Sequence, residues 1–340
     1  MKHTITLLLT FICLLNAQSS NSLDDHSEAL KMIRSENPTF KPSAAPQMTS
    51  KQIADLGFEQ VYTSNSRKFK MRDGKSLHAN IFEKKATTIT VLLHGILSSS
   101  YLMNKTSGLL REALNSEIVT LDLRGHGQSD GNPGDVDYID QYAHDLYDVI
   151  SILKKEYPSY KILIAGHSMG GGIALRYSML KQKISVDGYV LLAPHLGHNS
   201  PMVQREKTTN SDVSQFMKVH IERIIGLEMM NSKNIHKYDS LPVLFFNLPK
   251  QMPITKYSFR ANKSAAPADY ITGLKSVSAP MIVLIGSNDE AFDASEISSI
   301  VTTYSSGKSV VIQDETHGGI RHNKQTMIDI SKWAKTMVNK

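Results

Sequence analysis

Short apolar runs alternate with amphipathic stretches along most of the chain, and this alternation is its dominant pattern. The apolar runs are rich in β-branched residues and have the length of strands; they occupy residues 87–93, 117–123, 161–166, 186–193, 280–286 and 309–313. Apolar residues recur at helical spacing in residues 100–114, 139–157, 173–180, 295–304 and 323–338. Strands that alternate with helices in this way predict an α/β fold, with a mainly parallel central sheet and helices on both faces.

One pair of runs near the start of this pattern predicts an antiparallel hairpin instead. Residues 68–72 and 77–82 each alternate apolar and polar positions, and they flank the turn-forming pair Asp73-Gly74. The hairpin would begin the core.

The alternation breaks between residues 195 and 270, where prolines are frequent and a single amphipathic helix is predicted near residues 213–230. Ligands bind at the edge of a parallel sheet where the strands end, so an irregular insertion after one of these strands is well placed to cover that edge. We therefore interpret residues 195–270 as a cap insertion, and residues 61–194 and 271–340 as the core.

The first residues have the pattern of a secretory signal peptide. A basic start is followed by an apolar stretch of about eleven residues, Ile5–Leu15, and then by small and polar residues. We predict that residues 1–18 are a signal peptide and that the protein is exported, either to a periplasm or out of the cell. Residues 19–60 are polar and contain prolines, which predicts a weakly structured N-terminal leader. The only cysteine is Cys13, so the mature chain would have neither a disulfide nor a catalytic thiol.

Composition and charge narrow the classes of partner. The chain of 340 residues is 41% hydrophobic, enough for a large core, and carries a formal net charge of +6. The basic residues are scattered among acidic ones and form no stripe with interleaved aromatics, so we predict no nucleic-acid partner. Mild cationic character allows transient contact with an anionic membrane surface. The oligomeric state is left open.

The strongest chemical motif is Gly166-His167-Ser168-Met169-Gly170, which joins a buried strand to a helix. A serine at the apex of a tight strand-to-helix turn needs small residues two positions on either side, because larger ones would clash with the backbone. The following helix directs its N-terminal N–H groups towards the serine, where an oxyanion would form. This is the pattern of a nucleophile elbow, with Ser168 as the nucleophile.

A serine hydroxyl needs a base, and the base needs an orienting carboxylate. Asp289 directly follows the strand 280–286 and is the preferred acid, with Glu290 and Asp293 as alternatives. His317 follows the last strand and is the preferred base, with His322 as the alternative. The order serine, acid, histidine is that of hydrolases whose nucleophile lies on such an elbow.

Two backbone N–H groups would hold the oxyanion. One belongs to Met169, just after the nucleophile, and the other to Ile96, which follows His94-Gly95 at the end of the strand 87–93. We predict no cofactor and no metal. The pair His195 and His198 follows another strand, but no third ligand with suitable spacing accompanies it.

Taken together, these motifs resemble the α/β-hydrolase superfamily, and the arrangement is most similar to its monoacylglycerol lipase and lysophospholipase branch, which is related to the serine aminopeptidases. The motifs that carry the resemblance are His94-Gly95, Asp122-Leu123-Arg124-Gly125-His126-Gly127-Gln128-Ser129, the Ser168 elbow, Gly286-Ser287-Asn288-Asp289 and the late His317. The resemblance covers residues 69–338 apart from the cap. It implies the α/β-hydrolase fold, and it implies that the loop from Arg124 to Gly127 supports the site structurally.

The motifs predict a serine hydrolase that cleaves carboxylic esters through an acyl-enzyme on Ser168. Monoacylglycerols, lysophospholipids and short acyl esters, that is, small-molecule or lipid esters, are the expected substrates. Two alternatives stay open. One is an aminopeptidase-type serine peptidase, although acidic residues that could bind a free amine are sparse in the cap. The other is a non-catalytic module that binds lipids or a protein partner.

Overall fold

The computed structural model describes residues 22–40, 49–203 and 216–338, and the predicted signal peptide lies outside these ranges. The chain divides into two compact units, one of Met1–Asn37 with His220–Tyr238 and one of Pro38–Val219 with Asp239–Lys340. Within the described ranges, no helix combines the length and apolar character needed to cross a membrane.

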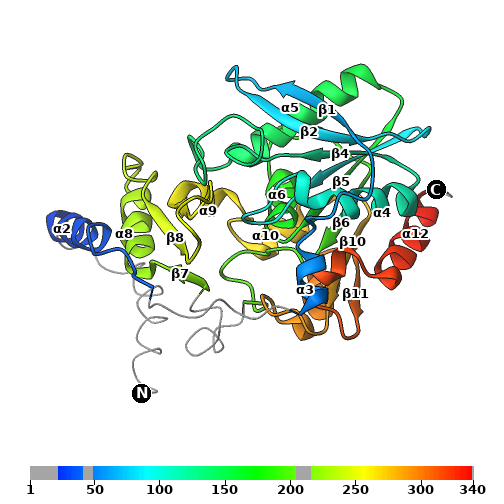
Figure 1. Ribbon diagram of the computed structural model, residues 1–340. Coiled ribbons are helices and arrows are strands. Elements are labelled where there is room, and N and C mark those ends of the chain that lie inside the picture. Colours follow the sequence, from blue (N-terminus) through cyan, green and yellow to red (C-terminus); the bar gives the residue numbers. More distant parts are fainter. Residues whose placement is uncertain (1–21, 41–48, 204–215, 339–340) are drawn as a thin grey trace. The chain divides into compact units, whose positions relative to one another are not determined.

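An eight-stranded sheet organises the larger unit, in the order β1-β2-β4-β3-β5-β6-β10-β11 (Figure 1). Its strands are β1 (Asn65–Lys70), β2 (Ser76–Phe82), β3 (Thr88–Leu93), β4 (Glu117–Leu121), β5 (Lys161–His167), β6 (Gly188–Leu192), β10 (Met281–Gly286) and β11 (Lys308–Ile312). The hairpin β1–β2 is antiparallel and β2 joins β4 in antiparallel register, whereas all the other neighbours are parallel. The predicted mainly parallel sheet is therefore confirmed.

Two groups of helices cover this sheet. On one side α4 (Asn104–Leu114) packs against α12 (Lys324–Val338). The second group is α5 (Gln141–Glu156), α6 (Met169–Ser178), α10 (Tyr270–Lys275) and α11 (Ile297–Tyr304), in which α6 contacts both α5 and α10. Because helices cover the sheet, nearly every residue of β3, β5, β6 and β10 is buried, which explains why these strands are continuous apolar runs rather than alternating ones.

The predicted helix near residues 213–230 is wrong in its first part. Met217–Val219 form a strand, β7, and the helix α8 spans Ile221–Ser232, while residues 213–215 lie outside the described ranges. Apolar residues at Phe216 and Val219 fit a helical period as well as they fit a short strand. Pairing decides between the two, because β7 lies antiparallel to a strand 25 or more residues later in the chain.

That partner strand was not predicted. β8 (Pro242–Phe246) pairs with β7 on one side and with β9 (Lys256–Ser258) on the other, so the irregular stretch contains a three-stranded antiparallel sheet. A short helix, α9 (Phe259–Ser264), follows directly. The three-residue strands β7 and β9 are too short for a sequence period to reveal, whereas the five-residue apolar run of β8 was a signal that the sequence offered.

The leader predicted to be weakly structured also contains helices. In the larger unit, α3 (Ser50–Asp55) begins with a capping box between Thr49 and Gln52. In the smaller unit, α2 (Ser22–Ile33) packs against α8 at Gly226, where a Cβ atom would lie 2.7 Å from the carbonyl oxygen of Ala29. Long-range packing therefore orders segments that are polar and rich in proline.

Candidate active site

Ser168 occupies a strained turn between β5 and α6. Its backbone has φ 53° and ψ −116°, a conformation that residues with a side chain rarely adopt. A Cβ atom at Gly166 would lie 2.4 Å from the backbone of Gly170, and one at Gly170 would lie 2.3 Å from the carbonyl oxygen of Leu93. Both glycines are therefore required sterically, as the elbow pattern predicted.

Candidate oxyanion donors lie beside the serine. Met169 is the first residue of α6, so its N–H is among those without an acceptor in the helix. The loop after β3 approaches the same point, because a Cβ atom at Gly95 would lie 3.4 Å from Cβ of Ser168. Ile96, the other predicted donor, directly follows Gly95.

The predicted base and acid are in contact. His317 Nδ1 lies 2.8 Å from Asp289 Oδ2, and the carboxylate is fully shielded from solvent. The N–H groups of Ala291 and Phe292 each donate to Asp289 Oδ1 at 2.8 Å. One oxygen is held by the backbone and the other contacts the imidazole, which is the arrangement that a triad carboxylate needs.

The alternative acids and base have other partners. Glu290 Oε2 accepts from the backbone N–H of His317 at 3.0 Å, and Asp293 caps the turn at Ser295. His322 contacts Asp55 Oδ1 through Nδ1 at 3.2 Å and Thr106 Oγ1 through Nε2 at 3.1 Å. Of the three carboxylates considered, Asp289 is the one that contacts the His317 ring.

The loop that carries His317 lies against the elbow. The rings of His317 and His167 have centroids 4.8 Å apart, and His167 Nε2–H donates to the carbonyl oxygen of His317 at 2.9 Å. Within the described ranges, hydrogen bonds join His317 to Asp289, Glu290 and His167, but none joins it to Ser168 Oγ. Catalytic hydrogen bonds are often long without substrate and tighten when it binds.

Half-exposed apolar and aromatic side chains lie next to the groups that contact the nearly buried serine. Phe292 stands edge-on to His317 at 5.3 Å between ring centroids, and its other side stacks with His195 at 5.7 Å. Burial lowers the pKa of His195 to about 3, so its ring is neutral at physiological pH. The loop residues Ile96 and Leu97 are partly exposed as well. Phe292 was missed by sequence reasoning, and its place three residues after Asp289 was the available signal.

No metal centre is apparent in the ranges that the structure describes, where no three histidine, cysteine, aspartate or glutamate side chains gather. His195 and His198 lie edge to face at 5.1 Å between centroids. His198 Nε2 is also within 3.3 Å of the amide of Asn262.

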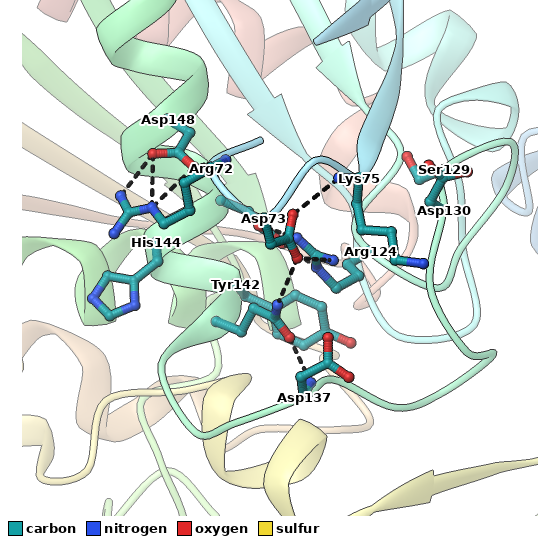
Figure 2. A network of polar contacts seen from close by, with 12 residues as sticks. Arg72, Asp73, Lys75, Arg124, Ser129, Asp130, Asp137, Tyr142, His144 and Asp148 are labelled. Carbon is teal, nitrogen blue, oxygen red and sulfur yellow. Dashed lines mark hydrogen bonds and ion pairs between the residues drawn. The ribbon is translucent and has the colours of Figure 1, made fainter. Parts of the chain in front are cut away.

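Arg124, in the loop after β4, is buried in an ion-pair network rather than open to substrate (Figure 2). It donates through Nε and Nη2 to both oxygens of Asp145, and Nη1 lies 2.8 Å from Asp73. This agrees with the structural role that the resemblance implied. A surface hollow of about 680 Å³ lies beside Arg72 and Asp148, and none of the Ser168 site residues lines it.

Comparisons with known proteins agree with this geometry. The profile of the family described as serine aminopeptidase, S33, matches residues 84–322. Rat (Rattus norvegicus) monoglyceride lipase is 23% identical over 177 residues, which are 51% of this chain and 58% of the relative. An uncharacterized protein of Mycobacterium tuberculosis is 34% identical over 88 residues, 26% of this chain and 24% of the relative. The chain thus spans between a quarter and somewhat over half of the length of these relatives.

Solved structures show the same fold. The esterase Est1E of Butyrivibrio proteoclasticus, solved with ferulic acid, superposes with a TM-score of 0.58 at 19% identity, covering 80% of this chain and 99% of the other. At that identity the likeness concerns the fold alone. Because the family profile matches well over half of the chain, on a sheet with an elbow serine, the chain belongs to the serine aminopeptidase S33 family of the α/β-hydrolases.

Proposed function

We propose that the protein is a serine hydrolase that cleaves carboxylic esters through an acyl-enzyme on Ser168. The observation that carries the proposal is the combination of a strained elbow serine at the start of α6 with a hydrogen-bonded His317–Asp289 pair on the adjoining loops. Backbone strain at a non-glycine residue is held by the surrounding structure and clusters at active sites, so the strained Ser168 supports this assignment.

In the proposed mechanism, Ser168 Oγ attacks the ester carbonyl carbon while His317 Nε2 takes the hydroxyl proton. Asp289 holds Nδ1–H and stabilises the imidazolium that forms. The N–H groups of Ile96 and Met169 would bind the oxyanion. The leaving alcohol takes the proton from His317, and water then cleaves the acyl-enzyme with His317 again acting as base. Substrate binding would bring His317 Nε2 within hydrogen-bonding distance of Ser168 Oγ.

Apolar side chains near the proposed catalytic groups support a substrate with an apolar acyl group. Ile96 and Leu97 follow Gly95 and are partly exposed, and the partly exposed Phe292 contacts the His317 ring, so apolar surface is available near the proposed catalytic groups for an acyl chain. The similarity to a monoglyceride lipase supports monoacylglycerols as substrates. Lysophospholipids and short acyl esters are further candidates with the same ester chemistry. A peptidase acting on a free N-terminus would need an uncommitted carboxylate near Ser168, whereas Asp289 and Glu290 both bind His317.

Hydrolysis of a panel of substrates tests this proposal. We expect the purified mature chain to hydrolyse p-nitrophenyl esters and monoacylglycerols, and to leave aminoacyl p-nitroanilides intact. Turnover of the anilides alone would support the peptidase. Failure of both substrate classes, together with no labelling of Ser168 by a fluorophosphonate, would support a non-catalytic module.

We also propose that the protein is exported after removal of residues 1–18, which rests on the sequence pattern alone. N-terminal sequencing of the protein recovered from its native host tests this, because retention of Met1 would contradict it.

A further inference from the structure

The loop after β3, residues 94–97, is held by buried side chains that the proposed mechanism does not use. Leu97 has φ 57°, a left-handed conformation that costs energy for a residue with a side chain. Such a conformation persists where neighbouring groups hold the adjoining peptides in place. Two peptide groups of the loop have such partners.

The Gly95–Ile96 peptide is held by His94. The N–H of Leu123 donates to His94 Nε2 at 3.1 Å, so the ring proton lies on Nδ1, and Nδ1 donates to the carbonyl oxygen of Gly95 at 2.8 Å. Burial lowers the pKa of His94, which keeps the ring neutral. In a trans peptide the C=O and N–H point in opposite directions, so fixing the Gly95 carbonyl also fixes the Ile96 N–H.

The next peptide, Ile96–Leu97, is held by Tyr257 from β9. The N–H of Leu97 donates to the hydroxyl oxygen of Tyr257 at 2.9 Å. This N–H is therefore already bound to protein and is not available to an oxyanion, which is consistent with the Ile96 N–H being the predicted donor of the loop. Tyr257 itself packs edge-on against Phe246 of β8, at 5.9 Å between ring centroids.

His126 fixes the direction of the Tyr257 hydroxyl. His126 Nδ1 lies 2.9 Å from the carbonyl oxygen of Arg124, which can only accept, so the ring proton lies on Nδ1. The other nitrogen, Nε2, is then an acceptor, and Tyr257 donates to it at 2.8 Å. Burial lowers the pKa of His126 to about 3 and raises that of Tyr257, so both groups keep these protonation states across the physiological range.

We infer that Tyr257 is a positioning residue for the oxyanion site, linking the three-stranded sheet β7-β8-β9 to the loop after β3. Its hydroxyl is oriented by His126 and accepts the Leu97 N–H, which holds the strained Leu97 turn and thereby the direction of the Ile96 N–H. The inference rests on the proposed function, because it assigns a role in the same reaction.

Tyr257→Phe removes the hydroxyl and keeps the ring against Phe246. We expect kcat to fall on the order of 10-fold with KM changed less than about 2-fold, since removal of a direct oxyanion donor costs 10²- to 10³-fold and a positioning group costs less. Affinity for a trifluoromethyl ketone, whose bound adduct carries an oxyanion, should fall by the same factor as kcat/KM.

Tyr142→Phe is the matched control. Tyr142 is buried with its ring centroid 6.4 Å from that of His126, and its hydroxyl has no hydrogen-bond partner. This variant should keep kcat and ketone affinity unchanged. Equal effects in the two variants, or a change in KM alone for Tyr257→Phe, would overturn the inference while leaving the ester hydrolase intact.

If Tyr257→Phe folds poorly, a milder change at its partner decides the question. His126→Gln keeps an acceptor for the Tyr257 hydroxyl, so a kcat intermediate between the wild type and Tyr257→Phe is expected, and an unchanged kcat would overturn the inference. A wild-type protein that hydrolyses no ester would remove both the proposed function and this inference.

Discussion

Two arrangements of serine, histidine and aspartate lie in the larger unit, and the one with the more complete hydrogen bonding is not the one on the elbow. On the hairpin, Ser66 Oγ lies 3.0 Å from His78 Nε2, and His78 Nδ1 lies 2.8 Å from Asp122 Oδ2. At the elbow, His317 and Asp289 are paired at 2.8 Å, and Ser168 Oγ has no such bond to His317.

The backbone around each serine is what differs. Ser66 lies inside strand β1 and is paired in register with Asn80, so its backbone is ordinary extended chain. Ser168 has a positive φ, precedes a ten-residue helix and lies beside Gly95. A hydrogen-bonded chain of three side chains therefore does not define a hydrolase site. In the proposed function, the difference is made by backbone donors for an oxyanion and by a strained backbone that presents the hydroxyl to them.

The largest expected effect comes from removing each serine in turn. Ser168→Ala should lower ester turnover by 10⁴- to 10⁶-fold and abolish fluorophosphonate labelling, because the nucleophile is lost. Ser66→Ala is the matched control and should change neither. Assays of both purified variants check this, and labelling that persists in Ser168→Ala but disappears in Ser66→Ala would reverse the comparison.

The histidine of the hairpin is paired with Asp122 and that of the elbow with Asp289. The second largest effect is expected from a change of Asp289. Asp289→Asn should lower kcat on the order of 10³- to 10⁴-fold, because the amide favours the wrong tautomer of His317. Asp293→Asn, four residues later, should keep activity within a few-fold, since asparagine can also cap the turn at Ser295. Steady-state kinetics separates them, and a larger loss in Asp293→Asn would mean that the acid is misassigned.

A smaller effect is expected at the hairpin, in stability alone. His78→Phe would remove one hydrogen bond from the buried Asp122 carboxylate, which keeps the N–H groups of Ser100 and Gln128, and should lower the free energy of unfolding by about 2 kcal/mol. Activity per folded molecule should be unchanged. Denaturant unfolding and active-site titration measure the two quantities, and a fall in kcat would show that the hairpin arrangement takes part in catalysis.

The smallest effect concerns protonation beside the elbow. Desolvation of the half-buried His195 lowers its folded-state pKa to about 3, below the ordinary value of 6.5. Between pH 3 and pH 6.5, His195 is protonated in the unfolded chain but not in the folded one. The contribution of the neutral ring to the free energy of unfolding is therefore fully present above pH 6.5 and falls as the pH drops. Titration of His195 should lower the free energy of unfolding by about 2 kcal/mol at pH 5 relative to pH 7.

The variant His195→Phe removes this titration and offers an aromatic ring to Phe292. Its loss of stability between pH 7 and pH 5 should be smaller than that of the wild type by about 2 kcal/mol. Chemical denaturation at both pH values gives the difference. An equal loss in both proteins would show that His195 is protonated in the folded state.

The sequence was most informative where a local pattern determines the structure. The continuous apolar runs of β5 and β10 and the two glycines around Ser168 were readable, because buried parallel strands and a tight elbow each demand particular residues. Asp289 and His317 could be chosen because the carboxyl ends of parallel strands meet at one edge.

Features that depend on distant partners were not readable. The strand β7 fits a helical period and becomes a strand through pairing with Phe246 and its neighbours. Tyr257 carries no motif, and its contact with the loop after β3 joins residues 160 positions apart. Similarly, the hairpin arrangement of Ser66 and His78 looks like ordinary strand sequence until Asp122 is placed beside it.

The helix α3, which precedes the sheet, has a consequence for the design of truncated forms of this protein. Lys51 binds Glu315 at 2.6 Å, Asp55 contacts His322, and the carbonyl of Asp55 accepts from Arg321, so α3 fastens the loop that presents His317. A recombinant chain started at residue 61, where the recognisable core begins, would cut all three tethers. A shortened chain should therefore start before Thr49. If a chain with a later start were inactive, the cause would be the lost contacts to the loop that carries His317, and the assignment of the catalytic residues would not be contradicted.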